Sequence, residues 1–151
     1  MLVGRDTEIR KVCSLLPRAR LVTLHGPPGI GKSAIARAAV QHEADVVFCD
    51  VTNARSYEDV CFVLAGALDV SLGGGGDLGR VLADACPKNA LVVLDGCEGA
   101  SDAVAKLVVE LGEVRVLATS REVLRAEGEV PVEIDPLADA DGIALFVHAA
   151  R

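Results

Sequence analysis

Short apolar runs recur along this chain, separated by stretches in which apolar residues return every three or four positions. The runs cover residues 20–25, 45–50, 90–95, 113–118 and 129–134. An apolar run of this length is typical of a strand buried on both faces, and the longer spacing is typical of a helix packed on a sheet. The pattern therefore predicts alternating strands and helices, an α/β fold with a right-handed parallel sheet.

The fifth run alternates in polarity and contains Pro131, which predicts an edge strand because proline cannot donate to a strand ladder. Cap residues predict where the helices begin and end. We expect Asp6 or Thr7 to cap the first helix, and Ser56, Asp77 and Ser101 to start later ones, the last ending at Gly112. The predicted core covers residues 1–136. Residues 137–151 begin a further helical segment with nothing downstream to cover its apolar face, so we expect a fragment of something longer.

The segment from Gly26 to Ser33 fits the pattern G-x-x-x-x-G-K-[ST] between a predicted strand and a predicted helix. Inward-facing backbone amides can surround a triphosphate only where side chains do not intrude, which explains the glycines. Lys32 supplies a cation for the phosphates, Ser33 a hydroxyl for Mg²⁺, and the helix N-terminus a partial positive charge. The predicted phosphate-binding residues are Gly26, Pro27, Pro28, Gly29, Ile30, Gly31, Lys32, Ser33 and Ala34.

Polar residues end two further strands. Asp95 closes the run at residues 90–95, and Thr119, Ser120 and Arg121 follow the run at 113–118. Ligands of open α/β sheets bind at the carboxyl edge of the strands, so Asp95 is poised to hold Mg²⁺. If these groups meet at one phosphate, both strands lie close to the strand at 21–25.

Composition narrows the class of protein. With 151 residues the chain is expected to form one domain, and its net charge of −7 opposes direct contact with nucleic acid or anionic lipid. No apolar run is long enough to span a membrane and no N-terminal leader is visible, so we expect a cytoplasmic protein. The five cysteines form no C-x-x-C pair and are expected to be reduced and mostly buried, and nothing suggests that Cys97 is a nucleophile.

Taken in order, several segments resemble the NTPase domain of the STAND class, the signal-transduction ATPases with numerous domains, also described as NB-ARC or AP-ATPase-like. The resemblance is nearest to the domains of bacterial LuxR-like and antibiotic-regulatory (SARP-type) transcription factors. The segments are Val3-Gly4-Arg5-Asp6-x-Glu8, the phosphate loop, Leu91 to Glu98, Val116 to Glu122, and Pro136-Leu137 with Ala144-Leu145-Phe146. This resemblance implies a three-layer αβα P-loop NTPase with strand order 5-1-4-3-2.

It also implies ATP or ADP with Mg²⁺, and a molecular switch with slow Mg²⁺-dependent ATP hydrolysis. By the same resemblance Lys32 and Ser33 contact phosphate and metal, Asp95 contacts the metal, and Arg121 senses the γ-phosphate. Gly4 and Arg5 are expected near the base and ribose. Many relatives carry Asn where Gly96 stands, and the nearest acidic candidate for a water-activating base is Glu98.

The expected partners follow from the same family. They are winged-helix and sensor domains further along the full-length protein, together with nucleotide-dependent self-association. Two other functions stay open on the sequence, a nucleotide-binding scaffold without turnover and a small-molecule P-loop kinase. A transporter ATPase and a GTPase are disfavoured, because no glutamate follows Asp95 and no Asn-Lys-x-Asp segment is present.

Overall fold

Five parallel strands form one sheet in the computed structural model, which describes residues 5–73 and 76–136. They lie in the order β2-β3-β4-β1-β5, and every neighbouring pair is parallel. Read from the other edge this is 5-1-4-3-2, so the predicted parallel sheet and its strand order are confirmed. The strands are β1 (Leu21–His25), β2 (Val46–Asp50), β3 (Leu91–Asp95), β4 (Arg115–Ser120) and β5 (Glu129–Glu133).

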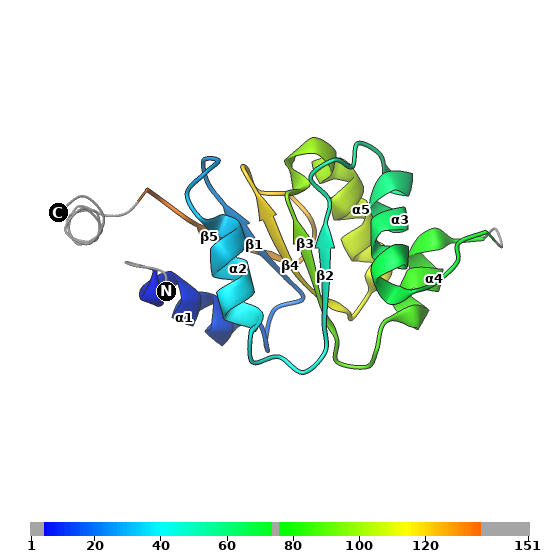
Figure 1. Ribbon diagram of the computed structural model, residues 1–151, viewed down its shortest axis with the longest axis horizontal. Helices are drawn as coiled ribbons and strands as arrows, with labels where there is room; N and C mark the ends of the chain where they lie inside the picture. Colours follow the sequence, from blue (N-terminus) through cyan, green and yellow to red (C-terminus); the bar gives the residue numbers. More distant parts are fainter. Residues whose placement is uncertain (1–4, 74–75, 137–151) are drawn as a thin grey trace.

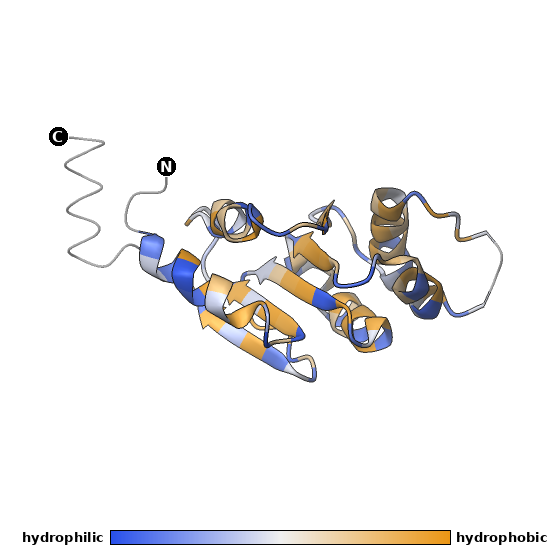
Figure 2. Ribbon diagram, turned by 90° about the horizontal axis from the view of Figure 1, so that it is seen from below, coloured by the Kyte–Doolittle hydropathy of each residue, from blue (hydrophilic) through white to orange (hydrophobic). Residues whose placement is uncertain are grey.

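Helices cover the sheet on both faces (Figure 1). In β3, Leu91 and Val93 pack in one apolar cluster and Val92 and Leu94 in another, as expected of a strand with two buried faces. Figure 2 shows the strands mostly in hydrophobic colours and the helices in mixed ones. The first cluster contains α1 (Asp6–Leu15) and α2 (Lys32–Val40), and the second contains α3 (Tyr57–Leu68), α4 (Leu78–Ala85) and α5 (Ser101–Leu111). The three-layer αβα architecture is therefore confirmed.

Two of the predicted helix caps are present. The side chain of Ser56 accepts from the Asp59 amide at 3.1 Å, and that of Asp77 accepts from the Arg80 amide at 3.3 Å. Each bond satisfies one of the amides that a helix N-terminus leaves without an intrahelical acceptor.

Two other predicted caps are wrong. The N-cap of α1 is Arg5, without a side-chain capping bond, so neither Asp6 nor Thr7 has that role. Helix α5 is preceded by the 3-10 turn η1 (Cys97–Ala100), which makes Ala100 the N-cap and Ser101 the first helical residue. At the other end Gly112 closes α5 with a φ of 66°, as predicted.

The edge position of β5 agrees with its proline. In the described sheet β5 pairs with β1 alone, and Pro131 lies in the middle of it. Gly4 and the helix predicted over 138–151 fall outside the described residues, and the division at residue 136 stays a prediction. No described helix combines the length and apolar character needed to cross a bilayer.

All five cysteines are free thiols. Cys49, Cys61 and Cys97 are buried, Cys86 is half-buried and Cys13 is exposed, in agreement with the expectation of reduced and mostly buried residues. Burial raises the pKa of the Cys97 thiol, and nearby Glu98 and Asp95 raise it further. A thiol with a raised pKa is a poor nucleophile at neutral pH, which agrees with giving Cys97 no catalytic role.

Candidate functional site

The carboxyl ends of β1, β3 and β4 meet at one edge of the sheet. Strand β4, which ends at Ser120, pairs with β1 on one side and with β3 on the other. Strand β3, which ends at Asp95, is therefore separated from β1 by one strand. A cavity of about 240 Å³ opens at this edge. Its lining comprises Pro28, Gly29, Gly31, Lys32, Ser33, Thr52, Asp95, Gly96, Glu98, Thr119 and Arg121.

Glycine is required at different positions of the loop for different physical reasons. Gly29 and Gly31 have φ angles of 79° and 96°, a region that side-chain-bearing residues rarely adopt. Gly26 lies under the backbone that leaves β5, and a Cβ there would collide with the Ile134 carbonyl oxygen. The main chain is held at this point because the Ile134 amide donates to the His25 carbonyl at 2.7 Å.

The loop presents free amides to the cavity edge. Within the part of the chain that the structure describes, the backbone N–H groups of residues 29–34 have no hydrogen-bond acceptor. The first intrahelical bond of α2 is donated by Ile35 to the Gly31 carbonyl. A run of unpaired amides at a helix N-terminus is a ready-made anion site, because the helix dipole adds to the donors.

Lys32 lies against this loop with 9% of its surface exposed. Its Nζ donates to the carbonyl oxygens of Gly26 at 2.6 Å and Pro27 at 2.8 Å. Burial lowers the pKa of Lys32, and the positive charge of Arg121 lowers it too, while Glu98 and Asp95 act in the opposite direction. The other three residues proposed as catalytic from the sequence, Asp95, Glu98 and Arg121, therefore all lie close enough to act on Lys32.

Asp95 is the centre of a hydrogen-bond network that joins the phosphate loop to the ends of β3 and β4. The Ser33 hydroxyl donates to Asp95 Oδ1 at 2.7 Å and lies 3.0 Å from Oδ2. The Thr119 hydroxyl donates to Asp95 Oδ1 at 2.6 Å and accepts from the Gly96 amide at 2.8 Å. Loop, β3 and β4 are thus connected through one carboxylate.

The oxygen atoms of Ser33 and Asp95 fit a Mg²⁺ ion that also contacts phosphate, since Mg²⁺ takes few protein ligands and prefers hard oxygens. The described residues contain no group of three or more His, Cys, Asp or Glu side chains that could hold a metal by themselves. A Mg²⁺ ion held by Ser33 and Asp95 would therefore take the rest of its coordination from phosphate oxygens and water.

The structure explains why position 96 is a glycine, which the sequence alone did not. Its φ is 83°, and a Cβ at this position would collide with the Thr52 side chain from the loop after β2. The residue after Asp95 therefore has a left-handed backbone and little space for a side chain beside Thr52. Thr52 itself lines the cavity and was not among the predicted site residues.

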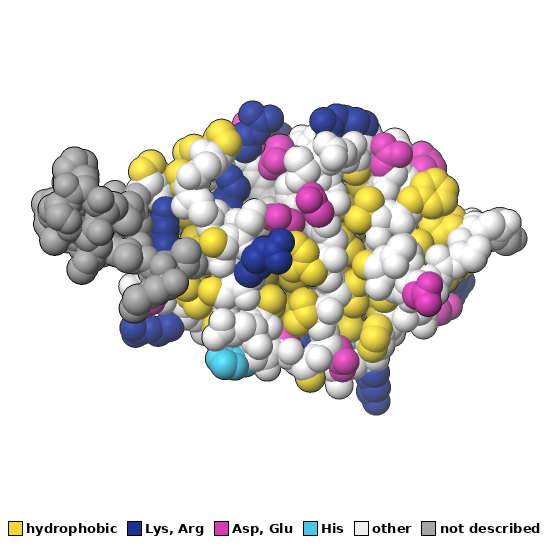
Figure 3. Space-filling view, viewed as in Figure 1, with side chains coloured by type: hydrophobic (Ala, Val, Ile, Leu, Met, Phe, Trp, Pro, Cys, Tyr) yellow, Lys and Arg dark blue, Asp and Glu magenta, His cyan; other side chains and the backbone are white. Residues whose placement is uncertain are grey.

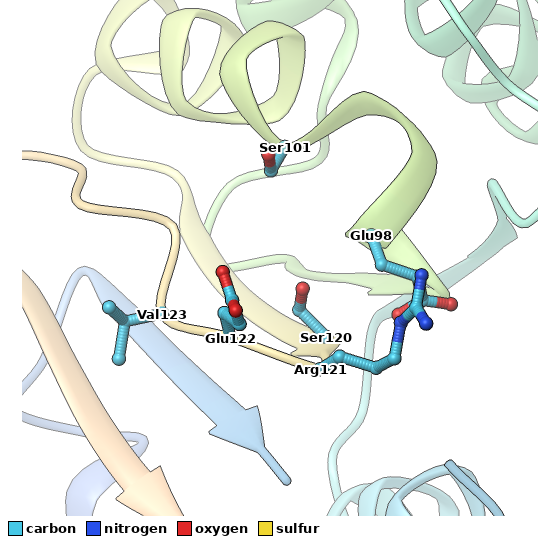
Figure 4. A pocket seen from close by; sticks show the side chains of 6 residues that line it. All are labelled: Glu98, Ser101, Ser120, Arg121, Glu122 and Val123. Carbon is cyan, nitrogen blue, oxygen red and sulfur yellow. The ribbon is translucent and has the colours of Figure 1, made fainter. Parts of the chain in front are cut away.

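Glu98 and Arg121 are exposed and line the loop cavity from its far side. Both also line a second cavity of about 340 Å³, which Figure 4 shows from close by. The two residues come from η1 and from the segment after β4. The structure thus brings Glu98 and Arg121 to the same edge as Lys32 and Asp95.

Arg5 is 6% exposed and is occupied by backbone contacts. Its guanidinium donates to the Ile30 carbonyl of the loop and to the Asp135 carbonyl after β5, both at 3.0 Å, and pairs with Glu8 at 3.0 Å. This places Arg5 next to the phosphate loop. Its expected nearness to a base or ribose stays a prediction.

Thr119 is the main site residue that the sequence did not identify as such. The Thr-Ser-Arg segment was expected to face the site, but only its arginine received a role. A polar residue at the end of a buried strand is the available signal, and it does not tell which of three neighbouring side chains turns toward Asp95. The structure shows that Thr119 does, with 2% of its surface exposed.

Sheet order, loop and strand-end acid together define an α/β domain with the P-loop ATPase fold. The family model described as "AAA ATPase domain" matches residues 1–73 of the chain. An uncharacterised protein of Mycobacterium tuberculosis is 35% identical over 163 residues, covering 99% of this chain and 41% of its own length. A second M. tuberculosis protein, named as a candidate HTH-type transcriptional regulator, is 34% identical over 148 residues and is covered over 17% of its length.

Solved structures share the fold at low sequence identity. The Aeropyrum pernix ORC1 protein, solved in complex with DNA, has a TM-score of 0.72 at 18% identity, with 99% of this chain and 50% of that one covered. A STAND protein with a tetratricopeptide repeat sensor from Pyrococcus horikoshii has a TM-score of 0.71 at 18% identity, with 99% and 26% covered. The chain therefore spans less than half the length of the curated relatives that it matches and at most half of these structures.

Proposed function

We propose that this chain is the nucleotide-binding switch domain of a signal-transduction or transcription regulator, which binds ATP or ADP with Mg²⁺ and hydrolyses ATP slowly. One observation carries the proposal. Gly29, Gly31, Lys32 and Ser33, whose amides are unpaired, line one cavity at the carboxyl edge of the sheet together with the Ser33–Asp95 pair. Donors, a cation and hard oxygen ligands in this arrangement suit a magnesium-bound polyphosphate.

The loop residues would bind and orient the phosphates. Amides 29–34 would donate to phosphate oxygens, and Lys32 would turn part of its donor capacity from the Gly26 and Pro27 carbonyls to the β- and γ-phosphates. Ser33 and Asp95 would hold Mg²⁺, which when bound offsets phosphate charge. Thr119 keeps the Asp95 carboxylate oriented through its hydroxyl.

The proposed hydrolysis is slow because the base is poorly held. Position 96 has little room for a side chain beside Thr52, and Glu98 is exposed on the short turn η1. Its carboxylate would accept the proton of the attacking water, but it makes no hydrogen bond to another described residue that would fix its position. Arg121, also exposed at this edge, would meet the γ-phosphate and so distinguish ATP from ADP.

The regulatory part of the proposal is supported by the kinds of protein in which similar domains occur. One relative is named as a candidate HTH-type regulator, and one structural neighbour is a STAND protein with a repeat sensor. Winged-helix and sensor domains, nucleotide-dependent self-association, and nearness to LuxR-like and SARP-type regulators are parts of this proposal. On the face drawn in Figure 3 the basic side chains are scattered among acidic ones, which supports the absence of direct nucleic-acid contact by this domain.

A nucleotide-binding scaffold without turnover is the second candidate, and Gly96 favours it, because glycine supplies no carboxylate next to Asp95 and Thr52 leaves little room for one. A long single-turnover assay separates the two functions. Formation of ADP that depends on Mg²⁺ and falls in Glu98→Gln supports the slow ATPase. Tight nucleotide binding without ADP supports the scaffold, and transfer of the phosphoryl group to an added alcohol would indicate a kinase.

Calorimetry on a Lys32→Ala variant tests the binding site itself. The variant removes the amine that would contact two phosphates, and we expect ATP affinity to fall by at least about 100-fold, since each charged hydrogen bond contributes about 1.5–3 kcal/mol. Lys88→Ala is the matched control, because Lys88 is exposed and does not line the loop cavity. Equal ATP affinity in the Lys32 variant and the parent would show that the phosphates do not bind at this loop.

A further inference from the structure

A second cavity lies beside the proposed phosphate site. It has a volume of about 340 Å³ and is lined by Glu98, Ser101, Ser120, Arg121, Glu122 and Val123. Glu98 and Arg121 also line the loop cavity, so the two spaces are neighbours. Figure 4 shows the Ser120 and Glu122 side chains rising from β4 and its continuation toward Ser101 at the start of α5, with Arg121 extended toward Glu98.

The polar groups of this cavity lack partners within the protein. Ser120 is 1% exposed, yet its hydroxyl forms no hydrogen bond with any described residue. Across residues 5–73 and 76–136 the ion pairs are Arg5–Glu8 and Arg115–Glu43, so neither Glu98 nor Glu122 forms an ion pair there, although Arg121 extends toward Glu98. The Ser120 oxygen is not one of the fully buried unpaired atoms, which among the described residues are Arg20 Nε and Thr23 Oγ1, so it opens into the cavity and can contact a bound group.

The balance of charge selects a cation. Two carboxylates line the cavity against one guanidinium, and that guanidinium also faces the loop cavity. The acceptors come from η1, from β4 and from the segment after it, so they are spread around the space. A planar guanidinium carries five donors in a fork and can reach several such acceptors, whereas an ammonium is a compact point charge.

We propose that this cavity, the Glu98–Glu122 pocket, binds a guanidinium group, and that bound ATP strengthens the binding. The carboxylates of Glu98 and Glu122 accept from the guanidinium, and the Ser120 hydroxyl accepts one further N–H. The effect of ATP rests on the proposed function: a γ-phosphate draws Arg121 toward the loop cavity and removes the competing cation. The pocket itself does not depend on that function.

The direct test is an NMR titration of the nucleotide-free protein with methylguanidinium up to about 20 mM, well below the molar range in which guanidinium denatures proteins. N-methylurea is the matched probe, with a similar shape and no charge. We expect saturable shifts of the amides of residues 98–101 and 120–123 with methylguanidinium only. Absence of saturation, or equal binding of N-methylurea, overturns the proposal.

Variants locate the binding. Glu122→Gln is expected to weaken methylguanidinium binding about tenfold, because a charged acceptor becomes neutral. Glu127→Gln is the control, since Glu127 is exposed on the same connection and does not line the cavity. Ser120→Ala is expected to weaken binding about threefold without lowering the midpoint of thermal unfolding, because the hydroxyl has no partner to lose. Unchanged affinity in both Glu122→Gln and Ser120→Ala overturns the assignment.

Two further arms identify the source and the coupling. An acetyl-Ala-Arg-Ala-amide peptide that binds at least tenfold more tightly than methylguanidinium indicates an arginine side chain of a protein, and equal affinities indicate a free small molecule. A non-hydrolysable ATP analogue with Mg²⁺ is expected to raise guanidinium affinity about fivefold relative to ADP, and the reciprocal effect on the nucleotide follows from linkage. Equal affinity with both nucleotides refutes the coupling. If the parent protein does not bind nucleotide, the proposed function is refuted. The titration of the nucleotide-free protein still tests the pocket in that case.

Discussion

Replacing Thr119 by Val removes one oxygen from the network around Asp95 and changes the shape of the side chain little. The lost hydroxyl donates to the Asp95 carboxylate at 2.6 Å and accepts from the Gly96 amide at 2.8 Å. A hydrogen bond to a charged group contributes about 1.5–3 kcal/mol, and a buried amide left unpaired costs about 1–3 kcal/mol. Because these terms overlap, we expect the free energy of unfolding to fall by about 2–4 kcal/mol.

The effect on function follows from the same geometry. Residues that orient a metal ligand change metal affinity by about 10–100-fold when removed, so Thr119→Val is expected to raise the Mg²⁺ concentration needed for tight ADP binding at least tenfold. ADP binding without Mg²⁺ is expected to stay unchanged, because the loop amides and Lys32 are intact. Urea unfolding gives the first quantity and calorimetry at several Mg²⁺ concentrations gives the second.

Thr119→Ser is the matched control. It keeps the hydroxyl and removes a methyl group, so its Mg²⁺ requirement should equal that of the parent. If Thr119→Val bound ADP with an unchanged Mg²⁺ dependence and unfolded at the same urea concentration, the hydrogen bonds from Thr119 would contribute nothing, and the argument about Asp95 would be wrong.

Three other substitutions test separate parts of the structure. Arg121→Ala should reduce the ratio of ATP affinity to ADP affinity, measured by calorimetry, with Arg125→Ala as the control. An unchanged ratio in Arg121→Ala would make Arg121 a structural residue. Gly96→Ala should lower the free energy of unfolding by about 2–4 kcal/mol through strain and contact with Thr52, and more than Gly128→Ala, whose φ is 80° but whose Cβ would meet open space. Burial raises the pKa of Cys49 from 9.0 to about 12, so between these pH values the unfolded thiol loses a proton that the folded one keeps. As the pH rises through this range, the Cys49 thiol should lower the free energy of unfolding by about 1.4 kcal/mol per pH unit. Cys49→Ala should remove this pH dependence. Cys13→Ala, which changes an exposed thiol, should leave it in place.

Much of the fold followed from patterns with a direct physical cause. Apolar runs predicted the strands because parallel strands are buried on both faces, and the glycine spacing predicted the loop because amides must reach an anion. Asp95 was identifiable because the phosphate loop upstream indicates a nucleotide site, and a carboxylate that ends a buried strand lies at the edge where α/β sheets bind ligands. The strand order came from the family resemblance, since periodicity carries no information on which strands are neighbours.

The features that the sequence did not predict depend on contacts between distant segments. The sequence predicts Ser101 as a cap because nothing local signals the 3-10 turn at Cys97–Ala100 that precedes α5. The missing side chain at Gly96 makes sense only beside Thr52, which lies more than forty positions earlier. The choice among Thr119, Ser120 and Arg121 depends on the alternation of β4, in which neighbouring side chains face opposite ways.

The contacts of Arg5 tie the phosphate loop to both flanks of the domain. One guanidinium joins the start of α1, the Ile30 carbonyl and the backbone at Asp135 after β5. When the loop tightens around an anion, the Ile30 carbonyl cannot shift without pulling on a side chain that is anchored at two other places. A movement of the phosphate loop on nucleotide binding would then be transmitted directly to the segment after β5, because the Arg5 side chain contacts both.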